Sequence, residues 1–126
     1  METSTRQVGD ATIVQYVGSI TLYNTPTIRK ELLGLIKEKK CPYVLVDMRQ
    51  VKYIDSSGVA ALVEALKSAM EAKTRFGLFG LTPTTKEVLS LTRLLHIFEV
   101  HDTEEQALTA PPPTTNLLAN KSPQHS

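Results

Sequence analysis

Four consecutive residues, Asp55-Ser56-Ser57-Gly58, bring together the polar groups of this chain that are best placed to do chemistry. An apolar-periodic run that begins at Val59 follows them and predicts a helix. The start of a helix leaves several backbone N–H groups unpaired, and here a carboxylate and two hydroxyls lie beside them. Such a helix start suits an anion, and a phosphate most of all. Two interpretations remain open: an ordinary helix cap, or a serine that is modified or binds a ligand.

The rest of the sequence gives little support for catalysis. It contains neither a Gly-x-x-x-x-Gly-Lys-Ser/Thr loop nor a Gly-x-Gly-x-x-Gly motif, so no cofactor is expected. Ser56 has no Gly-x-Ser-x-Gly frame, and no histidine has a sequence reason to act as its base. His101 and Asp102 alone are too few for a metal site, and a solvated turn explains them. The sequence therefore favours a protein that is not an enzyme and holds no metal.

Length and charge narrow the class of protein further. The 126 residues suit one domain, and a net charge of +1 gives no electrostatic case for nucleic acid. The basic residues within 37–40 complement the end of a predicted helix. Cys41 is the single cysteine, so no intrachain disulfide can form. The start of the chain lacks the apolar core of a signal peptide, and no run approaches the roughly 18 apolar residues of a membrane span. We expect a cytoplasmic protein.

The hydrophobic pattern predicts strands that alternate with helices. Strands are expected over 11–17, 43–48, 76–81 and 97–100, with a further short strand over 19–21. Helices are expected over about 24–40, 57–73, from 82 onward and over 103–108. This order predicts an α/β fold with a mixed, mainly parallel sheet flanked by helices. The first two strands have no helix between them and would form an antiparallel hairpin at the edge.

The predicted domain spans 7–109. Residues 1–6 are expected to be a flexible N-terminus, and the Pro/Thr/Ser-rich tail over 110–126 is expected to be disordered because it cannot bury a core. The residues expected in the core are Val44, Leu45, Val46, Leu62, Leu66, Leu78 and Leu81.

Four segments, read together, carry a family resemblance: 18–26, 43–48, 53–59 and 88–95, the last followed by Phe98. In this order they resemble the STAS domain, the fold of bacterial anti-sigma factor antagonists, over about 7–108. The sequence departs from the family pattern at two positions. Thr21 stands where the family often has an acidic residue, and Arg93 stands where a glycine is common.

The resemblance implies a partner-switching regulator. Ser56 would be phosphorylated by an anti-sigma factor that is also a serine kinase, and a serine phosphatase would reset the cycle. The dephosphorylated form would bind the anti-sigma factor and free the sigma factor. Asp55, Ser57 and Gly58 would support this site.

Contacts with the partner are expected from the loop before the first helix and from the start of the second helix, at Ser19, Thr21, Tyr23, Asn24 and Val59. The resemblance also leaves a homodimer open. STAS domains serve in lipid-transport (ABC) and stressosome-like complexes as well. The alternative function is therefore a constitutive interaction module that needs no kinase.

Overall fold

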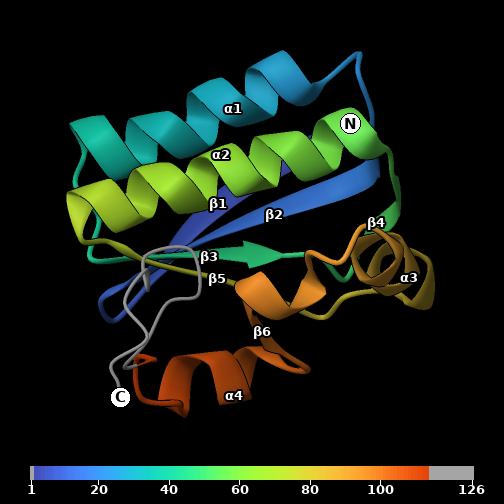
Figure 1. Cartoon of the computed structure of the whole chain (residues 1–126). Coiled ribbons are helices and arrows are strands. Elements are labelled where there is room, and N and C mark those ends of the chain that lie inside the picture. The colour runs from blue at the N-terminus through green and yellow to red at the C-terminus, as the bar shows by residue number, and fades with distance from the viewer. Residues whose placement is uncertain (1, 114–126) are drawn as a thin grey trace, which may run out of the picture.

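The computed structural model describes residues 2–113 (Figure 1). The first half of the chain forms β1 (Glu2–Val8), β2 (Ala11–Ile20), α1 (Thr25–Leu33), the π-helical turn η1 (Gly34–Glu38), β3 (Tyr43–Asp47) and β4 (Val51–Ile54). The second half forms α2 (Ser56–Ala72), β5 (Arg75–Phe79), α3 (Pro83–Leu91), the 3-10 turn η2 (Leu95–Ile97), β6 (Glu99–His101) and α4 (Glu104–Thr109).

One sheet runs through the domain in the order β1-β2-β3-β5-β6, and β4 pairs with the end of β2. The pair β1–β2 is antiparallel and every other pair is parallel. Figure 1 shows α1 and α2 over one face of this sheet and α4 on the other side. The prediction of a mixed, mainly parallel sheet flanked by helices is confirmed.

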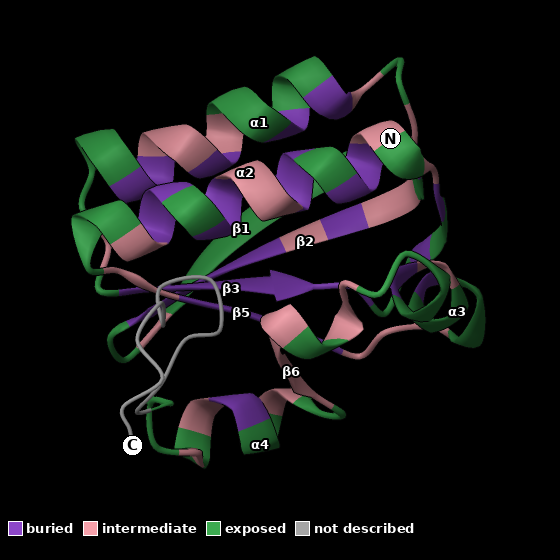
Figure 2. Ribbon diagram, viewed as in Figure 1, coloured by how far each residue is buried: buried purple, intermediate pink, exposed green. Residues whose placement is uncertain are grey.

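The core lies mainly between the sheet and the pair α1 and α2, whose buried residues face the strands (Figure 2). A smaller apolar cluster lies beneath α4. Strand β3 is buried along its whole length, as expected for a central parallel strand. The predicted core residues are buried, with the exception of Leu81, which is half-buried against the core.

The N-terminal prediction is wrong for residues 2–6. They belong to β1, which pairs with β2 through a two-residue loop, Gly9 and Asp10. The edge hairpin is therefore β1–β2. Of the segment predicted as a second strand over 19–21, Ser19 and Ile20 form the end of β2, which continues past a bulge at Gly18, and Thr21 begins the following loop. The side chains from Glu2 to Gln7 are polar and exposed, so no apolar alternation marks this strand in the sequence.

Further boundaries differ from the prediction, among them those of the strands predicted over 76–81 and 97–100, which are Arg75–Phe79 and Glu99–His101. The 51–54 segment forms a strand, β4, and the α-helical part of the predicted 24–40 helix ends at Leu33, where η1 begins. The predicted tail over 110–126 begins with ordered contacts, because Arg75 donates hydrogen bonds to the carbonyl oxygens of Ala110 and Pro111. The remainder of that tail, 114–126, lies outside the described residues.

The end of α3 explains why a glycine suits position 93. Leu94 N–H donates to Leu89 O at 2.9 Å and Arg93 N–H donates to Ser90 O at 3.0 Å, which are the two hydrogen bonds of a Schellman motif. Arg93 occupies the left-handed position of this motif with a φ of 62°. A side chain at such a φ is strained, whereas glycine adopts it freely.

We therefore expect Arg93→Gly to raise the free energy of unfolding by about 0.5–1 kcal/mol. Arg93→Ala removes the same charge but keeps a Cβ, so it is the matched control and should give no such gain. Urea denaturation followed by circular dichroism measures both variants. Equal stabilisation by the two substitutions would show that the arginine side chain, and not the backbone conformation, is the source of the effect.

Candidate functional site

The site is built where two parallel strands end side by side. Strands β2 and β4 pair up to Ile20 and Ile54, and Asp55 N–H extends the pairing with a 3.0 Å hydrogen bond to Ile20 O. The chain leaves β2 into the loop over 21–24 and leaves β4 directly into α2. This pairing therefore places that loop beside the start of α2, although the two segments are more than 30 residues apart in the sequence.

Asp55 caps the N-terminus of α2 and connects the loop over 21–24 to this helix by a hydrogen bond. Its Oδ1 accepts hydrogen bonds from Gly58 N–H at 3.0 Å and from the Ser57 hydroxyl at 2.6 Å. Its Oδ2 accepts one from Leu22 N–H at 3.0 Å. The hydrogen bond from Ser57, followed by that from Gly58 N–H, lowers the pKa of Asp55 below its ordinary value. Asp55 is therefore a carboxylate at neutral pH.

We expect Asp55→Ala to lower the free energy of unfolding by about 1–2 kcal/mol at pH 7, because the helix loses its cap and the loop loses its tie. A carboxyl whose pKa is lowered by folding stabilises the protein above the pKa of the unfolded chain, and this contribution disappears as pH falls through the folded pKa. The difference between the variant and the parent should therefore shrink in acid. Thermal melts between pH 7 and pH 3 test this, and a difference independent of pH would contradict it.

Asn24 stabilises the conformation of the loop over 21–24 through two side-chain hydrogen bonds. Its Oδ1 accepts from Thr21 N–H at 2.9 Å, and its Nδ2 donates to Ser19 O at 2.7 Å. Asn24 precedes α1 but its side chain does not cap that helix. Of the residues predicted to contact a partner, Asn24 is thus mainly a support for the loop, while Ser19 is exposed and Thr21 is half-buried.

The two serines at the helix start differ in their contacts. Ser56 is the first residue of α2 and is exposed, and its side chain has no hydrogen-bond partner within residues 2–113. Ser57 is half-buried, and its hydroxyl donates to Asp55. The hydroxyl available to another protein is therefore that of Ser56.

Gly58 lets α2 start close to the sheet. A Cβ at this position would lie 2.6 Å from Ile54 Cγ1, 2.7 Å from Ile20 Cγ2 and 3.1 Å from Ile20 O. Only a hydrogen atom fits in this space, because the contact includes backbone as well as side chains. Gly58 is therefore a structural residue that sets the distance between Ser56 and the strand ends.

Large apolar side chains are exposed around this helix start. Tyr23 is 95% exposed and Leu22 is 66% exposed in the loop, and Tyr53 on β4 is 46% exposed. Tyr53 pairs with Ser19 in the sheet, so these side chains belong to neighbouring elements. Leu22 and Tyr53 are absent from the predicted contact residues. Val59, which is among them, is only 3% exposed and packs in the core.

A groove extends from Ser56 along α2. It has a volume of about 510 Å³, and its lining is mainly apolar. One wall follows a stripe of α2 and the other is the turn after α3; the lining residues are Ser56, Val59, Ala60, Val63, Glu64, Lys67, Thr92 and Leu94. Glu64 in this stripe is paired with Arg29 of α1, and that hydrogen bond lowers the pKa of Glu64. Sequence patterns could not reveal the groove, because its second wall comes from a distant turn.

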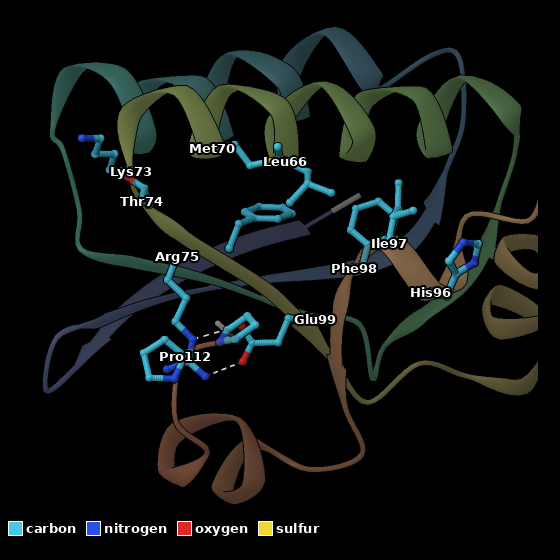
Figure 3. Close-up of a pocket in the computed structure, with 12 residues that line it drawn as sticks. Leu66, Met70, Lys73, Thr74, Arg75, His96, Ile97, Phe98, Glu99 and Pro112 are labelled. Atoms are coloured by element: carbon cyan, nitrogen blue, oxygen red, sulfur yellow. Dashed lines mark hydrogen bonds and ion pairs between the residues drawn. The ribbon is translucent and has the colours of Figure 1, made fainter. Parts of the chain in front are cut away.

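A second cavity, of about 490 Å³, lies at the opposite end of α2 (Figure 3). Leu66 and Met70 from α2 line it, together with Arg75 and Glu99, which form an ion pair with each other. His96 is at its border. This cavity does not include Ser56, so the histidine it contains is separate from the serine site.

The described residues contain neither a metal-binding cluster of side chains nor a helix that could span a membrane. Within residues 2–113, no group of three or more His, Cys, Asp or Glu side chains is arranged to hold a metal ion. In the same part of the chain, every helix is too short or too polar to cross a membrane.

Comparison with known proteins gives the family. The chain matches the STAS domain over residues 2–107. It is 31% identical over 87 residues to a protein of Listeria monocytogenes named anti-sigma-B factor antagonist, and the match covers 69% of this chain and 75% of that relative.

Solved structures with the same fold include an anti-sigma factor antagonist from Mycobacterium paratuberculosis, with a TM-score of 0.77, 23% identity and coverage of 86% of this chain and 91% of that one. The Bacillus cell fate determinant SpoIIAA in its phosphorylated form has a TM-score of 0.68 and 18% identity, and the match covers 85% of this chain and 96% of that one. The family match over residues 2–107 extends from β1 into α4, and it includes the strand ends and the helix start that form the site. The chain therefore belongs to the STAS domain family.

Proposed function

We propose that this protein is an anti-sigma factor antagonist, a non-catalytic regulator that binds an anti-sigma factor when Ser56 carries no phosphate. The observation that supports this proposal most directly is the exposed Ser56 hydroxyl at the start of α2. It lies at one end of an apolar groove and next to the elements that expose Leu22, Tyr23 and Tyr53. A relative with this function in its name supports the assignment. The protein works in the cytoplasm, where sigma factors and their regulators meet.

The surface around Ser56 suits a protein partner. Exposed tyrosine side chains are typical anchors of interfaces, and Tyr23 lies next to the exposed Leu22 on a loop that hydrogen bonds hold in place. The groove that extends from Ser56 has a mainly apolar lining that can take a partner segment; its charged residues are Lys67 and Glu64, and Glu64 is paired with Arg29. A chemical site needs convergent acid and base groups, whereas the carboxylate nearest Ser56, Asp55, is occupied as a helix cap.

The proposed switch uses the kinase activity of the partner. Phosphate on Ser56 adds about −1.5 to −2 charges at neutral pH. This charge lies at the N-terminus of α2, where the helix dipole stabilises an anion by roughly 0.3–1 kcal/mol, so the fold tolerates it. Binding of the partner is weakened by the same charge, because a dianion beside an apolar groove must lose its water when the partner binds. A serine phosphatase then restores the binding form.

The test is reconstitution of partner exchange. The protein is added to a complex of the anti-sigma factor encoded near its gene with the matching sigma factor, and release of labelled sigma factor is followed by fluorescence anisotropy. The expected result is stoichiometric release that stops when ATP allows phosphorylation. Tyr23→Ser should reduce release without lowering the melting temperature, because Tyr23 is almost fully exposed.

The alternative is a constitutive subunit of a lipid-transport or stressosome-like complex, since an apolar surface of this kind also suits a permanent partner. Affinity capture with the wild-type protein and with Tyr23→Ser separates the two. Recovery of transporter subunits, lost in the variant and unaffected by ATP, would refute the proposed function in favour of this alternative.

A further inference from the structure

The strand β1 is a long, free edge of the sheet. The order of strands ends at β1, so within residues 2–113 no other strand covers its outer side. Every residue from Glu2 to Gln7 is exposed, and Val8 is half-buried. A seven-residue edge strand without proline presents a row of unpaired backbone groups that can pair with another strand.

The hairpin turn determines which backbone groups point outward. A two-residue loop with a positive φ of 59° at Gly9 fits a type II′ turn, whose closing pair, Val8 and Ala11, is hydrogen-bonded. Hydrogen-bonded and non-hydrogen-bonded pairs alternate along an antiparallel ladder. The pairs of Thr3 with Tyr16 and of Thr5 with Val14 are therefore of the second kind. The N–H and C=O groups of Thr3 and Thr5 consequently point away from β2.

The sequence of this edge is complementary to itself. Read in both directions, Glu2-Thr3-Ser4-Thr5-Arg6 has the same order of residues with the charges exchanged. If a second copy pairs antiparallel about Ser4, each Thr3 lies opposite Thr5 of the second copy, and their outward backbone groups can exchange hydrogen bonds. Each Glu2 then lies opposite Arg6 of the second copy. Opposite charges directly across a ladder stabilise it.

The side chains of these opposite charges lie on the same face. Arg6 forms an ion pair with Glu104 of α4, so it is on the α4 side of the sheet. Residues an even number of positions apart share a face of a strand, so Glu2 is on that side as well. The Arg6 side chain is still half-exposed in its ion pair and can also reach a second carboxylate.

We propose that β1 is a docking surface for a second copy of this chain, with the two β1 strands antiparallel about Ser4 and two Glu2–Arg6 ion pairs across the interface. The two sheets then form one continuous sheet. This interface uses none of the residues around Ser56, so it goes beyond the proposed function and is independent of it. One strand pair buries less area than the roughly 1,200 Å² of a small stable interface, so the dimer is weak and depends on concentration.

Sedimentation equilibrium of the full chain over a wide range of concentration measures this association. Thr5→Pro removes an outward N–H and leaves the β1–β2 ladder intact, so it should weaken the dimer by at least about tenfold. Thr5→Val keeps the N–H and should dimerise as the parent does. Circular dichroism confirms that both variants are folded. A parent that stays monomeric at every concentration, or a Thr5→Pro variant that dimerises equally well, would overturn the proposal.

Reversal of the charges at positions 2 and 6 tests the register of the proposed β1–β1 pair without a proline substitution. Glu2→Arg alone places arginine opposite arginine, and Arg6→Glu alone places glutamate opposite glutamate, so each variant should self-associate at least about tenfold more weakly than the parent. Mixed in equal amounts, the two variants should form a heterodimer, because every arginine of one strand then faces a glutamate of the other. High salt should weaken this heterodimer. Absence of heterodimer in the mixture, or pairing of β1 with a foreign strand only, would refute the self-pairing.

Discussion

Ser56→Asp is expected to weaken binding of the anti-sigma factor by up to about three orders of magnitude while leaving the melting temperature nearly unchanged. A new charge repels a partner carboxylate 4 Å away by up to about 4 kcal/mol at an effective dielectric near 20, which corresponds to nearly three decades of affinity. The Asp55 carboxylate beside it adds to the negative field. The fold accepts the charge, because Ser56 is exposed at the N-terminus of α2.

Two controls separate charge from size in this experiment. Ser56→Asn has the shape of aspartate without its charge and should retain most of the affinity, and Ser56→Ala should bind constitutively. Isothermal titration calorimetry gives the affinities, and differential scanning calorimetry gives the melting temperatures. If Ser56→Asn binds as weakly as Ser56→Asp, the effect is steric. If Ser56→Asp unfolds, the effect lies in the fold and the proposed mechanism fails.

The second large effect is on stability, at Gly58. A Cβ there would overlap side-chain atoms of Ile54 and Ile20 and press on the backbone oxygen of Ile20. We expect Gly58→Ala to lower the free energy of unfolding by about 1–3 kcal/mol, the range typical of overpacking in a core. The helix must shift away from the strand ends, so partner binding should weaken as well.

Gly34 provides the matched control for this substitution. It also has helical dihedral angles, and a Cβ there would contact only Glu38 Oε1, at 3.8 Å. Gly34→Ala should therefore raise the free energy of unfolding by about 0.5–1 kcal/mol, because alanine favours helical backbone. Chemical denaturation of the two variants should give changes of opposite sign. A Gly58→Ala variant as stable as the parent would contradict the close packing of α2 on the strand ends.

The parts of the site that sequence could predict are those that depend on local geometry. Residues within one turn of each other predict a helix start with polar capping groups at 55–58, and they place Ser56 at that start. The unusual Arg93 was also visible, because the family pattern has glycine where the backbone is left-handed. The central strand over 43–48 was predicted because a continuous apolar run marks burial on both faces.

The parts that sequence could not predict depend on tertiary pairing. The hydrogen bond from Leu22 to Asp55 exists only because β2 and β4 end together, and no local pattern indicates that register. The sequence does not predict strand β1, because the side chains from Glu2 to Gln7 are polar and show no alternation of apolar and polar residues. The backbone of β1 nevertheless pairs with β2 along its whole length.

Mapping of the phosphate is the most direct test of the claim that Ser56 is the switch. The protein is incubated with ATP and the anti-sigma factor kinase, and tandem mass spectrometry locates the modification in the peptide that contains both serines. We predict phosphate on Ser56, loss of modification in Ser56→Ala and its retention in Ser57→Ala, with the phosphorylated protein released from the partner. Phosphate on Ser57, or a phosphorylated protein that remains bound, would contradict it.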